Sequence, residues 1–155
     1  PDILRTTKSG SIMSIFKPNC TIETTDKILV LEENKRKCIF SNPENLNLIK
    51  IIVDGCQITE GTRCDFLVLD QQKNEYFVEL KGKDIPHAIE QLEATIKQLS
   101  SSASLRKTAI IVSSRHPSND TSIQRAKALF KKKYKVDLIS KNIRLEIQIK
   151  QEKKR

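Results

Sequence analysis

The sequence has no apolar run long enough to cross a membrane, which takes about 18 to 20 residues. It also lacks a basic amphipathic helix with aromatic side chains on its apolar side, the pattern of a membrane-surface helix. No positively charged stretch followed by an apolar core and a small-residue cleavage site lies near the start, so no secretion signal is indicated. We therefore expect a cytoplasmic protein that does not bind membranes.

Cysteine is scarce and dispersed: Cys20, Cys38, Cys56 and Cys64 include no CxxC pair. A chain of 155 residues that is 37% apolar can bury a core without disulfides. We expect four free, mostly buried thiols in a reducing cytosol. The alternative is a zinc site assembled from all four, although structural zinc sites usually have closely spaced ligands.

Acidic residues are outnumbered, 19 Asp and Glu against 28 Lys and Arg, which gives a formal net charge of +9. This excess favours a polyanionic partner, nucleic acid above all. Aromatic residues make up only 5% of the chain and no helix has the features of a base-reading element, so the sequence indicates no base preference.

The pattern along the chain predicts one domain at residues 27–150, between a loosely ordered segment 1–26 and a basic tail 151–155. Apolar periodicity predicts strands at 27–31, 38–40, 108–112, 136–139 and 145–149, and helices at 85–99 and 122–134. Residues 42–55 fit either a helix capped near Asn42-Pro43-Glu44 or a strand at IKIIV. The element order predicts an α/β (α+β) fold, a mixed sheet with helices on both of its faces.

A hairpin is predicted where RCDFLVLD and EYFVELKGK flank the polar turn QQKN. If it is symmetric about Gln72, Asp65 lies opposite Glu79, Leu67 opposite Phe77 and Arg63 opposite Lys81. Directly opposed Cβ atoms are about 4.5–5.5 Å apart, so the two carboxylates repel unless a cation lies between them. The other face is then formed by Cys64, Phe66, Val68, Tyr76, Val78 and Leu80.

Asp65, Glu79 and Lys81 interrupt an otherwise apolar inward face of this hairpin. Charged residues at strand ends are often simply solvated, but on an inward face they cost desolvation energy that a structural strand would avoid. A hard divalent ion such as Mg²⁺ suits two carboxylates. The pattern therefore indicates a metal-binding site with a neighbouring ammonium group.

These residues resemble the motif of the PD-(D/E)xK nuclease superfamily, an acid on one strand followed by acid-x-lysine on the next. The resemblance covers about residues 50–115 and includes the following helix, ELKGKDIPHAIEQ. It implies a restriction-endonuclease-like core in which Asp65, Glu79 and the Leu80 carbonyl hold Mg²⁺ or Mn²⁺. Lys81 would orient or activate the attacking water, and Gln91 would position it.

The sequence departs from this motif in two places. Cys64 replaces the proline that usually precedes the first acid, and the frequent upstream glutamate has no clear match, with Glu44, Asp54 and Glu60 as candidates. Two residues of the helix are also open to a second interpretation. Gln91 can instead satisfy buried backbone groups. His87, one turn earlier on the same side of the helix, could position the water together with Gln91, or it can be a solvent-exposed residue of the first turn.

The expected activity is that of a DNA endonuclease, acting as a homodimer where both strands are cut. One alternative is a nucleic-acid-binding module that keeps the fold without catalysis, and another is a basic protein-interaction domain. Basic side chains that would contact phosphates without reading sequence, or that are merely solvated, are Arg106, Lys107, Arg115, Arg125, Lys131 and Lys132.

Overall fold

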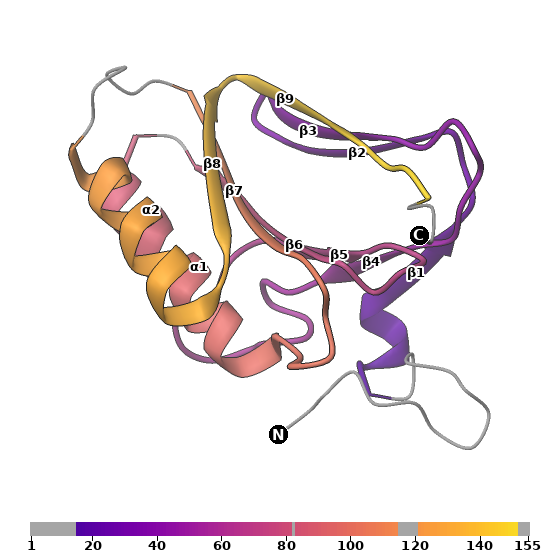
Figure 1. The fold of residues 1–155 in the computed structure, drawn as a ribbon, viewed down its shortest axis with the longest axis horizontal. Helices are drawn as coiled ribbons and strands as arrows, with labels where there is room; N and C mark the ends of the chain where they lie inside the picture. Colours follow the sequence, from indigo (N-terminus) through magenta and orange to yellow (C-terminus); the bar gives the residue numbers. More distant parts are fainter. Residues whose placement is uncertain (1–14, 82, 115–120, 152–155) are drawn as a thin grey trace.

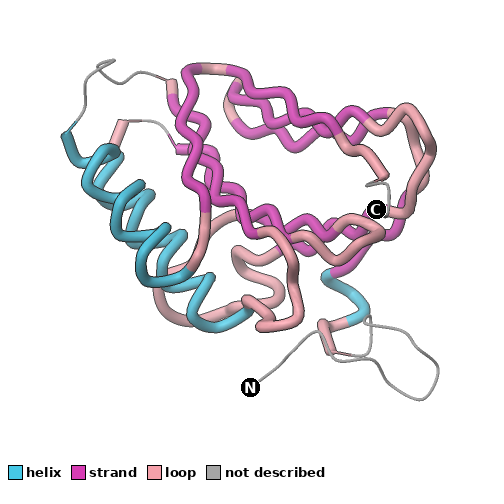
Figure 2. Tube along the Cα trace, viewed as in Figure 1, coloured by secondary structure: helices cyan, strands magenta, loops and turns pink. Residues whose placement is uncertain are grey.

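The computed structural model describes residues 15–81, 83–114 and 121–151, apart from the side chain of Lys81. Within these residues the chain forms a layer of helices, a six-stranded sheet and a three-stranded sheet (Figures 1 and 2). The expected mixed sheet with helices is therefore confirmed.

The six-stranded sheet has the strand order β1-β4-β5-β6-β7-β8. The pairs from β1 to β6 are antiparallel, whereas β6, β7 and β8 run parallel to one another. The strands are β1 (Thr21–Thr24), β4 (Leu48–Ile52), β5 (Phe66–Leu69), β6 (Glu75–Lys81), β7 (Lys107–Ser113) and β8 (Asp137–Asn142).

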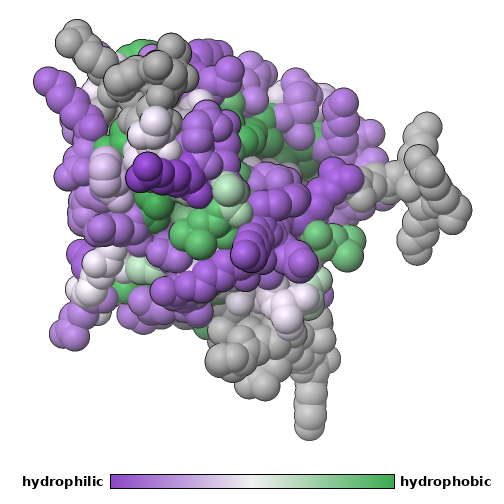
Figure 3. Space-filling view, turned by 60° about the vertical axis from the view of Figure 1, so that its left-hand side comes forward, coloured by the Kyte–Doolittle hydropathy of each residue, from purple (hydrophilic) through white to green (hydrophobic). Residues whose placement is uncertain are grey.

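Two helices connect the parallel strands and cover one face of this sheet (Figure 1). α1 (Ile85–Leu99) matches the predicted helix, and the carboxylate of Asp84 caps it by accepting from the His87 amide at 3.1 Å. α2 (Thr121–Tyr134) begins one residue before the predicted start. Figure 3, which turns the helix side forward, shows mainly hydrophilic side chains there. Within the described residues, no helix combines the length and apolar character needed to span a bilayer.

The opposite face of the six-stranded sheet is covered by a second sheet of order β2-β3-β9. Its strands are β2 (Ile28–Glu33), β3 (Arg36–Ser41) and β9 (Arg144–Gln148). The expectation of helices on both faces is therefore wrong. Both faces of β5 and β6 are apolar, and such a surface can be buried equally well by a sheet or by helices.

Residues 42–47 form a turn that leads into strand β4, so the strand alternative for IKIIV is confirmed. Asn42 is fully buried and organises the turn: its Oδ1 accepts from the Leu46 amide at 3.0 Å and its Nδ2 donates to the Leu46 carbonyl at 2.8 Å. Because these bonds satisfy the local backbone without helical pairing, the chain turns here and enters the sheet as β4.

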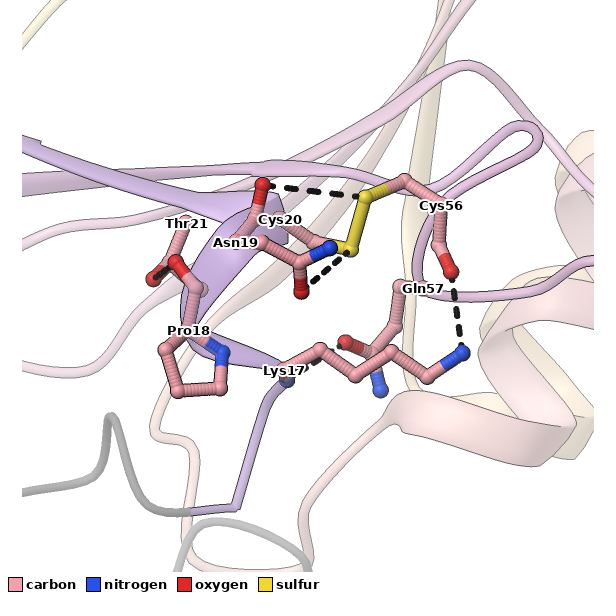
Figure 4. Close-up of a disulfide and its surroundings, with 7 residues drawn as sticks. All are labelled: Lys17, Pro18, Asn19, Cys20, Thr21, Cys56 and Gln57. Atoms are coloured by element: carbon pink, nitrogen blue, oxygen red, sulfur yellow. Dashed lines mark hydrogen bonds between the residues drawn. A yellow bond between two sulfur atoms is a disulfide. The ribbon is translucent and has the colours of Figure 1, made fainter.

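The segment expected to be loosely ordered contributes regular structure from residue 18 onward. A 3₁₀ turn, η2 (Pro18–Cys20), leads into β1, which pairs with β4. Cys20 forms a disulfide with Cys56, whose Cα lies 5.7 Å away (Figure 4). Residues 1–14 of this segment, and all of the predicted basic tail except Gln151, lie outside the described residues.

The expectation of four free thiols is therefore wrong for Cys20 and Cys56 and correct for Cys38 and Cys64. Cys38 lies in the core between the two sheets and Cys64 in the core beneath the helices, so the four sulfurs do not meet in one place. The bonded pair is separated by 36 residues, and only the pairing of β1 with β4 brings it together.

We expect removal of the disulfide to lower the free energy of unfolding. In a Cys20→Ser/Cys56→Ser variant the unfolded chain regains the conformational freedom that a closed loop of this length removes. This lowers the free energy of unfolding by about 2–4 kcal/mol. Urea denaturation of the variant, and of the native chain with and without dithiothreitol, measures this. Reduction of the native chain should reproduce the effect of the variant, and equal midpoints with and without reductant would contradict the prediction.

Candidate active site

Asp65 and Glu79 are brought together by the hairpin of β5 and β6. Phe66 pairs with Val78 and Leu67 with Phe77, which confirms the predicted register within β5. The predicted pairs of Asp65 with Glu79 and of Arg63 with Lys81 lie beyond the paired residues of this hairpin and stay predictions. One residue before β5, the Asp65 amide donates to the Val78 carbonyl at 3.2 Å. The two carboxylates therefore lie on adjoining segments at one end of the sheet.

The surroundings of these carboxylates are largely buried. Glu79 is 2% exposed, and the Leu80 amide donates to Oδ2 of Asp65 at 2.8 Å. Burial raises the pKa of the neighbouring Cys64 thiol, and the negative charges of Glu79 and Asp65 raise it further. Both carboxylates thus act on one sulfur, which is consistent with their lying close together.

The opposite face of the hairpin is formed as predicted, with one exception. The side chains of Phe66, Val68, Tyr76, Val78 and Leu80 pack in the core between the two sheets. Cys64, predicted on that face, packs in the core beneath the helices instead. It precedes β5, where the strict alternation of strand side chains no longer applies.

Thr95 ties the segment before Asp65 to helix α1. Its Oγ1 accepts from the Cys64 amide at 2.8 Å, and its hydroxyl donates to the Gln91 carbonyl at 2.9 Å. Thr95 is fully buried, so these bonds are shielded from water. The sequence pattern does not single out this residue, which is one polar position in an otherwise apolar helix stripe.

Gln91 serves a backbone group and also presents a second polar atom. Its Nε2 donates to the Arg63 carbonyl at 3.0 Å, in agreement with the structural interpretation of this residue. Its Oε1 is buried and has no hydrogen-bond partner among the described residues. A buried amide oxygen in this condition is suited to accept a hydrogen bond from water or a ligand.

A hollow of about 370 Å³ adjoins Gln91, and we call it the Arg63 hollow. Nε of Arg63 donates to Oδ1 of Asp54 at 2.8 Å, and its Nη1 donates to the Gly61 carbonyl at 2.7 Å. The side chain of His87 is 45% exposed, as expected for a first-turn residue. The described residues that line the hollow are Asp54, Gly61, Thr62, Arg63, His87 and Gln91.

For two residues of the predicted centre, Leu80 and Lys81, the backbone contacts show where they lie. Lys81 is the last residue of β6 and pairs with Ser113, while its side chain lies outside the described part of the structure. Leu80 directs its side chain into the core between the sheets and its amide to Asp65. The proposed use of its carbonyl as a metal ligand stays a prediction.

None of the three candidates for an upstream acid joins the two carboxylates as a third ligand. Asp54 lies nearest in the chain fold, because its amide contacts the Asp65 carbonyl at 3.3 Å, but its carboxylate pairs with Arg63. Glu44 accepts from the amide of Gln151, and Glu60 is exposed. Across the described ranges, no three His, Cys, Asp or Glu side chains form a group that could hold a metal.

Compared with known proteins, the chain matches no family model, no curated protein and no solved structure. The resemblance to the PD-(D/E)xK superfamily therefore depends on the residues of the hairpin and helix α1 alone.

Of the predicted phosphate-contacting residues that the structure describes, Lys107 lies toward the end of the sheet away from Asp65 and Glu79. Lys107 pairs with Glu75, four residues before Glu79 in β6, which is a separation of about 13 Å along the strand. Lys131 and Lys132 lie in the last turn of α2, and Arg106 directly precedes β7. Arg125 is an exposed residue of α2, and Arg115 lies outside the described residues.

A second buried carboxylate, missed in the sequence, occupies the other end of β6. Glu75 is fully buried and accepts from the Ser100 hydroxyl at 2.6 Å and from the Ser101 amide at 2.8 Å. Burial raises the pKa of Glu75, although these hydrogen bonds and the charge of Lys107 oppose the rise. Glu75 lies four residues before Glu79 on the same face of the strand, next to the serine-rich segment after α1.

We expect Thr95→Val to lower stability by about 1–3 kcal/mol, because the buried Cys64 amide loses its acceptor while the side-chain volume is kept. Urea denaturation measures the loss, and hydrogen exchange at the Cys64 amide should accelerate. Thr25→Val, at an exposed threonine, is the matched control. An unchanged midpoint together with unchanged exchange would show that this contact does not hold the segment.

We expect Glu75→Gln to stabilise the protein increasingly as the pH rises above about 4.5, the ordinary pKa of the group. A carboxyl whose folded-state pKa is raised favours folding below its unfolded pKa, and this contribution is lost as the pH rises through the folded pKa. The glutamine oxygen can still accept from Ser101, and its amide can donate to the Ser100 hydroxyl. Denaturation from pH 4 to 8 tests this against the exposed control Glu146→Gln, and a pH-independent difference would contradict it.

Proposed function

We propose that the chain is a divalent-metal-dependent nuclease that hydrolyses phosphodiester bonds of DNA. The observation that carries the proposal is that Asp65 and Glu79 lie on adjoining segments at one end of the sheet, where the charges of both act on the buried Cys64 thiol. Two carboxylates so placed repel each other unless a cation relieves their charge. The net charge of +9 is consistent with a nucleic acid as the substrate.

The available donors fit Mg²⁺ or Mn²⁺. Mg²⁺ keeps several waters and is usually held by only one or two carboxylates together with substrate phosphates. Asp65 and Glu79 would hold it, with the Leu80 carbonyl as a further oxygen donor. Bound there, the ion would act as a Lewis acid toward the phosphate and would lower the pKa of a bound water.

The remaining residues of the centre would orient the reactants. Gln91 is fixed through Nε2 by the Arg63 carbonyl, so its buried Oε1 would accept a hydrogen bond from the attacking water and align it. Lys81, two residues after Glu79, would stabilise the charge that develops on the phosphate. One such centre cuts one strand, so cleavage of both strands would require a homodimer.

A second candidate function is a nucleic-acid-binding module without catalysis. The observation in its favour is that, of the described residues, no third acidic, histidine or cysteine side chain joins Asp65 and Glu79. In such a module the carboxylates would not retain a metal, whereas salt-sensitive binding to nucleic acid would persist.

The disulfide bears on where this activity would take place. Disulfides are rare in the reducing cytosol, so the cytoplasmic location expected from the sequence requires that the fold tolerate reduction of Cys20 and Cys56. The denaturation measurements in reductant described above address this requirement directly.

We expect the purified chain to cleave DNA in Mg²⁺ or Mn²⁺ and not in EDTA. Supercoiled plasmid, branched DNA, single-stranded DNA and RNA are assayed in parallel. Asp65→Asn, Glu79→Gln and Lys81→Ala should each lower the rate at least about 100-fold, the usual effect of losing one group that stabilises the transition state.

Metal binding, followed by calorimetry, separates the roles of these residues. Asp65→Asn and Glu79→Gln should weaken it, whereas Lys81→Ala and the exposed control Glu146→Gln should not. Cleavage by Glu79→Gln at the native rate would mean that the site is misplaced. If no substrate is cut while salt-sensitive binding remains, the binding module replaces the nuclease.

A further inference from the structure

Three lysines from separate elements meet at the end of the sheet opposite the candidate active site. Lys97 of α1, Lys107 of β7 and Lys133 of α2 line a hollow of about 490 Å³, which we call the three-lysine hollow. Its other described lining residues are Ile96, Gln98, Ser100, Ser102 and Tyr134. The surface therefore combines three ammonium groups with small hydroxyl and amide side chains.

The positive charge of this hollow is only partly offset by its surroundings. No Asp or Glu is among the described residues that line it. The Glu93 carboxylate accepts from the Tyr134 hydroxyl at 2.6 Å, and the Glu75 carboxylate lies buried beneath, bonded to Ser100 and Ser101. An anion entering the hollow would thus meet the lysines first.

Lys133 of the hollow and its neighbour Lys131 on α2 have different contacts. Lys131 is already paired with Asp137 at 2.9 Å, whereas Lys133 lies with Nζ 5.4 Å from the centre of the Tyr134 ring. This cation–π contact leaves the hydrogen-bond donors of the Lys133 ammonium available to a ligand. The sequence pattern predicted Lys107, Lys131 and Lys132 as contacts, but it contains no reason to place Lys97 beside them.

The spacing of the hollow from the carboxylates suits a nucleic-acid backbone. Lys107 pairs with Glu75, and Glu79 lies about 13 Å farther along β6. Since phosphates of one duplex strand advance by about 3.4 Å per nucleotide along the axis, this separation corresponds to about four nucleotides. Lysine ammonium groups are point charges that bind phosphate without reading bases.

We infer that the three-lysine hollow binds backbone phosphates of a nucleic acid about four nucleotides from the phosphodiester bond held at Asp65 and Glu79. The inference rests on the proposed function for the choice of nucleic acid as the anion and for the position of the cut. The hollow supplies affinity and fixes the path of the strand, while the carboxylates and Gln91 carry the chemistry.

The test measures binding of a fluorescein-labelled duplex, and of the corresponding single strand, by anisotropy in EDTA over a series of salt concentrations. Lys97→Gln/Lys133→Gln removes two exposed lysines of the hollow. Lys35→Gln/Lys150→Gln, at exposed positions associated with the three-stranded sheet, changes the net charge equally. Circular dichroism and thermal melting confirm that both variants are folded.

We expect the slope of log affinity against log salt to decrease by about two in the hollow variant, since each phosphate contact contributes about 0.9 on duplex DNA. The control pair should keep the native slope. Equal slopes in both pairs, whether both fall or neither does, would overturn the inference, as would a native chain that binds no nucleic acid. Lysine-dependent binding to phosphatidylserine vesicles with unchanged DNA binding would assign the hollow to a membrane surface instead.

The Glu79→Gln variant separates this inference from the proposed function. It should bind with the native salt slope while failing to cleave. A chain that binds through the hollow but never cuts in Mg²⁺ or Mn²⁺ would keep the phosphate site and lose the nuclease. Metal-dependent cleavage with no contribution from Lys97 and Lys133 to binding would keep the nuclease and rule out the phosphate site.

Discussion

β5 and β6 pair near the centre of the six-stranded sheet, and their register decides which side chains enter each of the two cores. Leu67 and Phe77 pack beneath the helices, whereas Val68 and Val78 pack against the second sheet. A slip of one residue between the strands would turn one of them over relative to the other. The same slip would separate Asp65 from Glu79, so the pairing that buries the core also builds the candidate site.

β6 buries two carboxylates on one face, and the environment of each suggests a different purpose. Glu75 receives hydrogen bonds from Ser100 and Ser101, which join the end of α1 to the sheet and account for its burial. Glu79 is buried near the Cys64 thiol, on which the charge of Asp65 also acts, and burial of a carboxylate in such surroundings costs desolvation energy. These hydrogen bonds give Glu75 a structural role, whereas Glu79 belongs to the proposed metal site.

The segment that leads to Asp65 is held from two sides. The disulfide between Cys20 and Cys56 fixes its beginning to the strand at the sheet edge, and Lys17 adds a hydrogen bond from Nζ to the Cys56 carbonyl at 3.0 Å (Figure 4). Thr95 and Gln91 of α1 bind the backbone of residues 63 and 64. These contacts hold the backbone that carries Arg63 and Asp65, and they would preorganise the proposed centre.

Local patterns in the chain are enough to predict the features that depend on neighbours close in sequence. Helix α1 and the register within β5 and β6 follow from apolar periodicity and a short turn, and both predictions are confirmed. Three features became visible only in the fold: which layer covers each face of the sheet, that Cys20 meets Cys56, and that Lys97 and Lys133 line one hollow. These features arise from residues far apart in sequence, because an apolar face or a charged side chain specifies what kind of partner it needs but not which distant segment supplies it.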